Sequence, residues 1–162
     1  MKVVVFSWKA LHNRIPTKDN LRIRNVLSPE TSTICMWCGR VDESVVHLFL
    51  HCDLAMGVWW KVMRWWNFSF VTPLNLFVHW AVWNGVETRK KLKKVLRLVW
   101  HATVWVLWTA RNNRIFNHEV RGTDDLVEEI KLLSWRWALH RLQLSPCLLY
   151  EWIWNPRECS IR

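Results

Sequence analysis

Four residues that can bind a metal lie close together in the first third of the sequence. They follow the pattern Cys35-x2-Cys38-x8-His47-x4-Cys52. Two thiolates separated by two residues can hold one ion from a tight turn, and a histidine and a cysteine from the next element can complete a tetrahedron. Zn²⁺ accepts sulfur and nitrogen ligands without a geometric preference of its own. Four protein ligands leave no position for a reactant, so the spacing predicts a structural zinc site.

His51 is a rival for the nitrogen ligand because it lies directly beside Cys52. Its ring could bind if the segment 47–52 is not folded as we expect. We favour His47, since its larger separation from Cys52 lets both side chains converge on one point. The alternative without a metal is a group of buried, reduced cysteines beside a surface histidine.

Two groups of basic residues could contact the phosphates of a nucleic acid. In the first, Lys90, Lys94 and Arg97 share one face of an expected helix, with Lys93 beside it. A solvated helix face is the alternative interpretation. The second basic group precedes the cysteines and consists of Arg14, Lys18, Arg22 and Arg24. Together with this group, Trp37 between the first two cysteines could stack on a base of a single strand if its ring is exposed. Burial is equally compatible with its position.

The composition of the 162-residue chain excludes several classes of protein. With 51% hydrophobic residues, four Gly and five Pro, the chain is neither disordered nor collagen-like. Its 23 Lys and Arg against 13 Asp and Glu give a net charge of +10, which favours an anionic partner such as nucleic acid. Fifteen Trp indicate aromatic-rich packing or an exposed aromatic surface.

Neither secretion nor membrane insertion is predicted. The apolar start of the chain is followed by Lys9 and lacks a small-residue cleavage site, so we expect an intracellular protein. The most apolar stretch, Leu98–Ala110, has thirteen residues, whereas a membrane span needs about 20. Cys147 and His140 could form a nucleophile and base, but no acid is placed to orient them, so no enzyme is predicted.

Helical spacing of apolar residues dominates the chain. Val4, Trp8 and Leu11 form the apolar stripe of a first expected helix. A helix at 87–117 is apolar on two faces, so it should lie at the centre and be covered on both sides. The tail 147–162 is expected to be irregular. The remaining expected elements are a helix after Thr17, a small hairpin within 31–46, and helices over 47–66, 73–83 and from 123 towards Pro146. The predicted fold class is therefore mainly α: a helical domain with a small zinc-stapled hairpin insert near its N-terminal third.

The residues around the metal-ligand pattern resemble a known family. The run FSWKALHNRIPTKDNL from Phe6 to Leu21 is followed by the CxxCG turn and by ESVVHLFLHC from Glu43 to Cys52. This combination resembles the zinc-binding domain that follows the reverse transcriptase of plant LINE-type (non-LTR) retrotransposons. The resemblance covers about residues 2–66 and implies that the zinc ligands are Cys35, Cys38, His47 and Cys52.

A second segment, residues 100–117 with WVLWTARNNRIF, resembles the region that follows this module, ahead of an RNase H region in longer polyproteins. We therefore expect a zinc-binding domain of reverse transcriptase type at 1–68 and a helical region at 69–162. A polymerase needs clustered aspartates to hold two Mg²⁺ ions. The one Asp pair, Asp124-Asp125, reads as a helix start, so polymerase activity is not expected.

The resemblance implies a zinc-binding module from a retroelement polyprotein, and the basic residues make RNA or single-stranded DNA the expected partner. The alternative is a zinc-stabilised structural fragment that does not bind nucleic acid. Such a fragment would dock on the reverse transcriptase or RNase H regions of a related polyprotein, and the Trp excess would supply its contact surface.

Overall fold

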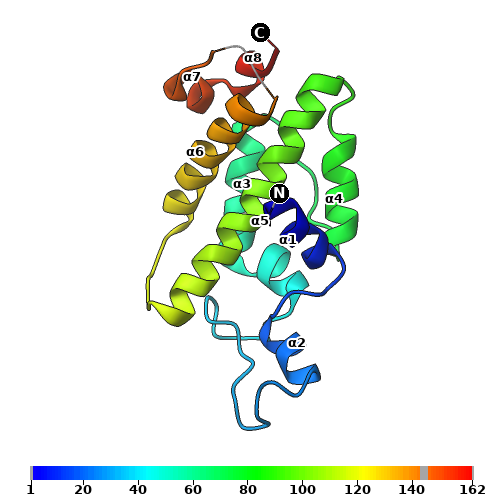
Figure 1. The fold of residues 1–162 in the computed structure, drawn as a ribbon, viewed down its shortest axis with the longest axis vertical. Helices are drawn as coiled ribbons and strands as arrows, with labels where there is room; N and C mark the ends of the chain where they lie inside the picture. Colours follow the sequence, from blue (N-terminus) through cyan, green and yellow to red (C-terminus); the bar gives the residue numbers. More distant parts are fainter. Residues whose placement is uncertain (1, 143–145, 162) are drawn as a thin grey trace.

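The structure is a computed structural model that describes residues 2–142 and 146–161, and it is mainly helical (Figure 1). The predicted fold class is confirmed. None of the helices in the described ranges is long and apolar enough to cross a bilayer. The elements are α1 (Lys2–Leu11), α2 (Lys18–Ile23), the π-helical turn η1 (His47–His51), α3 (Asp53–Trp65), α4 (Leu76–Gly85), α5 (Lys90–Phe116), α6 (Thr123–Leu142), α7 (Leu149–Trp154) and α8 (Pro156–Ile161).

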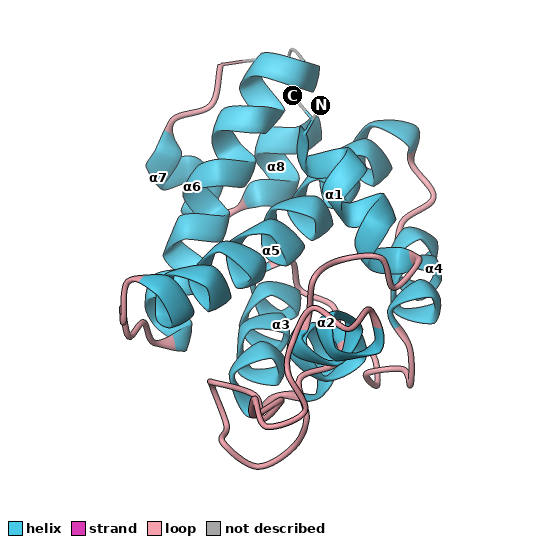
Figure 2. Cartoon of the chain, turned by 60° about the horizontal axis from the view of Figure 1, so that its bottom comes forward, coloured by secondary structure: helices cyan, strands magenta, loops and turns pink. Residues whose placement is uncertain are grey.

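The long helix α5 lies at the centre, as its two apolar faces predicted. Its 27 residues give a length of about 40 Å. It packs against α1, α3, α4, α6, α8 and η1, so most of its middle part is buried (Figure 2). The insert at residues 31–46, which carries Cys35 and Cys38 and is called the metal-binding loop below, lies with α2 at one end of the molecule (Figure 1). The start of α5 lies at the other end beside α8 (Figure 1).

Tryptophan rings fill much of the core. Trp59 lies 5.4 Å from Trp83 and 6.3 Å from Trp100, measured between ring centroids. Two of the buried indole N–H groups find backbone acceptors: Trp59 donates to the carbonyl of Phe49, and Trp83 donates to that of Leu96. This arrangement satisfies the polar atom of a ring that otherwise contributes only apolar surface. Much of the Trp excess therefore serves aromatic-rich packing.

His79 lies within this aromatic cluster and is 1% exposed. Its Nδ1 accepts a hydrogen bond of 3.0 Å from Nε1 of Trp100, so a proton on Nδ1 would break that bond. Burial lowers the pKa of His79 to about 4, below the usual 6.5.

A pH dependence of stability follows. The folded chain binds fewer protons at His79 than the unfolded chain does. The contribution of neutral His79 to the free energy of unfolding is therefore fully present above pH 6.5 and is lost as the pH falls towards 4. We expect the free energy of unfolding to fall by about 1 kcal/mol between pH 7.5 and 5.5 because of this group. Urea unfolding at both pH values measures it. The variant His79→Gln, which keeps an acceptor but does not titrate, should lose that part of the pH dependence; an unchanged slope would refute the assignment.

The apolar stripe expected on the first helix is wrong. Val4 and Trp8 are 45% and 48% exposed, and the buried face of α1 carries Val3, Ser7 and Ala10. Both faces of α1 have helical spacing, so the prediction from hydrophobicity took the face with the larger apolar side chains as the buried one. The small residues face the interior because α1 packs directly against α5.

Two loop predictions also differ from the structure. The insert at 31–46 turns back on itself as expected, but among the described residues its pairing is limited to one antiparallel bridge between Ile34 and Asp42. The tail is not irregular: it forms α7 and α8, and Trp152 is 1% exposed. Helices of six residues are unstable alone, so tertiary packing of Trp152 against Trp65 and Trp66 stabilises this part.

Candidate metal centre

A tight turn positions the first two cysteines. The amide of Gly39 donates to the carbonyl of Cys35 at 2.9 Å, and Gly39 adopts a positive φ of 65° that suits glycine. The amide of Cys35 donates to the carbonyl of Val41 at 2.8 Å, which holds the turn against the returning segment of the loop. Both thiols of the Cys-x2-Cys pair therefore project from one compact loop.

The π-helical turn η1 positions the other two side chains. The hydrogen bond that defines this π-helical turn spans five residues and joins the amide of Cys52 to the carbonyl of His47 at 2.8 Å. The hydroxyl of Ser44 accepts from the amide of His47 at 3.1 Å and fixes the start of the turn. Leu48, Phe49 and Leu50 between them are fully buried, so the turn is anchored in the core. π-Helical turns are rare and occur frequently at functional sites.

The four predicted ligands converge. Sγ of Cys35 lies 4.0 Å from Sγ of Cys52, and Sγ of Cys38 lies 3.3 Å from Nε2 of His47. All four ligand atoms lie within 4.8 Å of one another. A tetrahedral zinc with bonds of about 2.3 Å to sulfur and 2.0–2.1 Å to nitrogen separates two sulfurs by about 3.8 Å and a sulfur from a nitrogen by about 3.5 Å. The donor set and its spacing therefore fit one tetrahedral metal ion.

The two buried thiols titrate against each other. The hydrogen bond from Cys52 lowers the pKa of Cys35, and the same contact raises the pKa of Cys52. Two thiolates 4.0 Å apart in a buried site repel each other, so both can be ionised only with a cation between them. This electrostatic requirement also fits a metal site.

The rival histidine lies outside the cluster. Nε2 of His51 is 3.1 Å from the carbonyl oxygen of Pro73, and His51 is not among the converging ligands. The structure thus brings His47 to the site, as the wider spacing from Cys52 favoured.

We expect a sharp contrast between the two histidines. His47→Ala should weaken zinc binding by about 100-fold or more, because it removes one of four ligands. His51→Ala should leave the zinc content unchanged, since that ring bonds only a backbone carbonyl. Competition with a colorimetric chelator measures both affinities. Equal losses in the two variants would show that the ligand assignment is wrong.

A buried ion pair joins the metal-binding loop to the central helix. Glu43 in the loop is 0% exposed and accepts from Nε of Arg111 on α5 at 3.1 Å through each carboxylate oxygen. The same carboxylate accepts from the amide of Lys18 at 3.1 Å. Arg111 also stacks over Trp108, with its guanidinium carbon 5.0 Å from the ring centroid. Glu43 and Arg111 lie in two separate segments of the sequence, and the sequence pattern does not predict their pairing.

The predicted phosphate contacts near the metal are partly occupied by the protein itself. Nζ of Lys18 donates to the carbonyl of Ile34 at 2.7 Å, and Arg22 donates to the carbonyl of Thr31. Both cations thus hold the metal-binding loop. Arg14 lies over the ring of Trp8, 5.4 Å from its centroid; the remaining member of this group, Arg24, is exposed.

The second predicted group lies at the other end of the molecule, at the start of α5 (Figure 1). Lys90 and Lys94 are exposed and Lys93 is partly exposed, whereas Nε of Arg97 donates to Asn84 at 2.6 Å. The structure therefore does not bring the two basic groups together into one surface. Trp37 is half-buried against the core.

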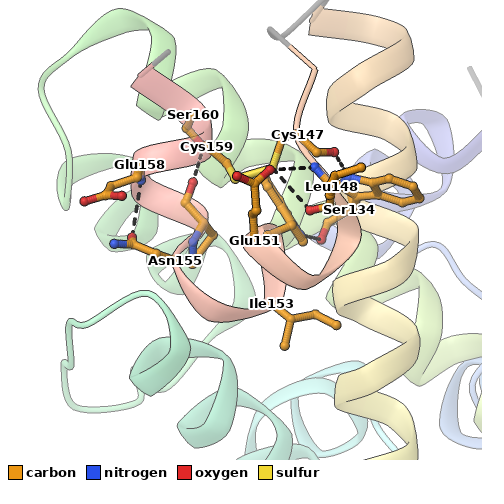
Figure 3. Close-up of a disulfide and its surroundings, with 12 residues drawn as sticks. Ser134, Cys147, Leu148, Glu151, Ile153, Asn155, Glu158, Cys159 and Ser160 are labelled. Atoms are coloured by element: carbon orange, nitrogen blue, oxygen red, sulfur yellow. Dashed lines mark hydrogen bonds between the residues drawn. A yellow bond between two sulfur atoms is a disulfide. The ribbon is translucent and has the colours of Figure 1, made fainter.

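The last two cysteines form a disulfide that the sequence analysis missed. Cys147 and Cys159 are bonded to each other across twelve residues and join the segment before α7 to α8 (Figure 3). Cys147 is therefore not a nucleophile paired with His140. The signal in the sequence was two cysteines twelve residues apart, but this spacing alone predicts neither a disulfide nor a metal site.

Comparison with known proteins agrees with the geometry of the cluster. Residues 1–59 match the model of a family described as zinc-binding in reverse transcriptase. The matched segment contains all four converging ligands. The match and the cluster together support a zinc-binding domain in this part of the chain. No curated protein and no solved structure gives a significant match.

Proposed function

We propose that this chain is a zinc-stabilised nucleic-acid-binding module, derived from the reverse transcriptase polyprotein of a plant LINE-type retrotransposon and lacking enzymatic activity. The single observation that carries the proposal is the convergence of Cys35, Cys38, His47 and Cys52 within a segment that matches the reverse transcriptase zinc-binding family. The partner is RNA or single-stranded DNA.

The zinc serves the fold of the loop in this proposal. When bound, it neutralises the thiolates and supplies the stabilisation that an apolar core gives to larger domains. Protein groups then position the loop: Glu43 ties it to α5 through Arg111, and Lys18 ties it to α2. Phosphate binding depends on the net charge of +10 and on the exposed or partly exposed lysines Lys90, Lys93 and Lys94.

A salt series tests this function directly. Filter binding of single-stranded RNA and DNA should weaken steadily with salt, with a slope of about 0.7 per phosphate contact in the logarithmic plot. With three to five contacts, affinity at low salt should exceed that at high salt by at least tenfold. No binding at low salt, or binding that ignores salt, contradicts the proposal.

A second candidate is docking on a protein, such as the reverse transcriptase or RNase H region of a related polyprotein. The observation that favours it is an apolar surface on α1 and α4, where Trp8 is 48% and Phe77 is 61% exposed. A cavity of about 400 Å³ lies between these helices and the segment before η1, lined partly by Leu11 and Val78. Salt-insensitive binding of such a protein region, without nucleic-acid binding, would favour this candidate.

A further inference from the structure

A cavity lies at the end of the molecule opposite the metal-binding loop. Its volume is about 410 Å³, and it is formed by the end of α3, the start of α5 and the α7–α8 pair (Figure 1). Its lining includes Trp65, Arg89, Trp154, Arg157 and Glu158. This size lies within the range of about 300–1,000 Å³ that is typical of ligand sites.

Trp154 is the most exposed of the fifteen tryptophans, with 88% of its surface accessible. The ring is nevertheless attached to a fixed support. The disulfide between Cys147 and Cys159 joins the two ends of the α7–α8 segment (Figure 3), and the neighbouring Trp152 is buried. An accessible indole on a held helix end is a suitable platform for stacking a base.

Two arginines on the cavity wall are held by one buried carboxylate. Oε2 of Glu87 accepts from Arg89 at 2.9 Å and from Arg157 at 2.8 Å. Glu87 is 7% exposed, and the hydrogen bond from Arg89 lowers its pKa to about 2, so it remains ionised. Two guanidinium groups on one carboxylate leave a surplus positive charge in a fixed position. Planar, oriented guanidinium groups suit phosphate recognition.

The basic face of α5 continues from this wall. At about 100° per residue, Arg89, Lys93 and Arg97 follow one another along the helix, with Lys90 and Lys94 beside them. Within the part of the chain that the structure describes, none of the three lysines has a carboxylate partner. Their charges are therefore available to a ligand, in contrast to Lys18 and Arg22 at the metal-binding end.

We infer that a single-stranded nucleic acid binds across this end of the molecule, with one base stacked on Trp154 and its phosphates on Arg89, Arg157 and the lysines of α5. The inference rests on the proposed function and adds the location of the site. It places binding away from the metal, whose loop has a structural role.

Glu158 supplies a test of the sign of the ligand's charge. It is exposed and lines the same cavity, so its carboxylate lies near the proposed phosphate path. An anionic ligand is repelled by Glu158, whereas a cationic protein segment would be attracted. Removing this charge must therefore change the affinity in opposite directions for the two kinds of partner.

The experiment measures fluorescence anisotropy of labelled single-stranded RNA and DNA of about twelve nucleotides with the full, zinc-loaded chain. Trp154→Ala should weaken binding by about 5- to 150-fold, the usual effect of losing one stacked base. Trp60→Ala is the matched control, because Trp60 is also exposed but lies on α3 and does not line the cavity. It should stay within about twofold of the unchanged chain. Glu158→Gln should tighten binding by about two- to fivefold.

Each outcome decides between the claims. If the unchanged chain binds with a clear salt dependence but Trp154→Ala binds equally well, the inferred location is wrong and the proposed function stands. If Glu158→Gln weakens binding of the strand, the Glu158 carboxylate does not repel it, and the inferred location is also wrong. If the unchanged chain does not bind at low salt, the proposed function and the inference both fail.

Discussion

Replacing Arg111 by Met should lower the free energy of unfolding by about 3–5 kcal/mol. Arg111 and Glu43 are 5% and 0% exposed, so the substitution would leave a buried carboxylate without its cation. The amide of Lys18 is then one of few remaining donors to that carboxylate. The loss should appear in urea unfolding as a lower midpoint with an unchanged slope.

The double variant Glu43→Gln/Arg111→Met is the control for this prediction. It removes both charges and keeps a hydrogen-bond acceptor for the amide of Lys18, so its cost should be clearly smaller than that of Arg111→Met alone. Additive costs in the double-mutant cycle would show that the two side chains do not stabilise each other. That result would separate the metal-binding loop energetically from α5.

Cys35→Ser should unfold the metal-binding loop, because metal binding and local folding are one event in a segment with so few apolar residues. Apparent binding energies of structural zinc reach about 10–16 kcal/mol, which is as large as the whole stability of a typical domain. Limited trypsin digestion should therefore cut at Arg40 in the variant and in the chelator-treated chain. The zinc-loaded chain should resist the same digestion.

The double variant Cys147→Ser/Cys159→Ser provides the matched control, because its cysteines lie outside the cluster and are bonded to each other. It should retain the resistance at Arg40, whatever happens to α7 and α8. Equal resistance of residues 28–60 with and without chelator would refute the link between zinc and the fold of this loop.

Local features of the site were predictable from the sequence. The four ligands fall within eighteen residues, and their spacing indicates the tight turn at Gly39 and the helical turn from His47. Similarly, the two apolar faces of the expected helix at 87–117 predicted a central helix, which the structure has at Lys90–Phe116. Such features depend on neighbouring residues, so composition and periodicity suffice to recognise them.

Features that depend on tertiary packing were missed. Glu43 and Arg111 are 68 residues apart, and nothing local to either one indicates its partner. The helices α7 and α8 have six residues each, too short to form a periodic pattern, and depend on Trp152 and the disulfide. On α1, the small residues Ser7 and Ala10 are buried because they allow close packing. A search for a stripe of large apolar residues does not find such a face.

The metal content of the purified, unmodified chain tests the central claim most directly. Native mass spectrometry should find one zinc per chain, and alkylation of the zinc-loaded chain should leave the thiols of Cys35, Cys38 and Cys52 unmodified until a chelator is added. A chain that folds without zinc, and whose three thiols react equally with and without chelator, would contradict the account.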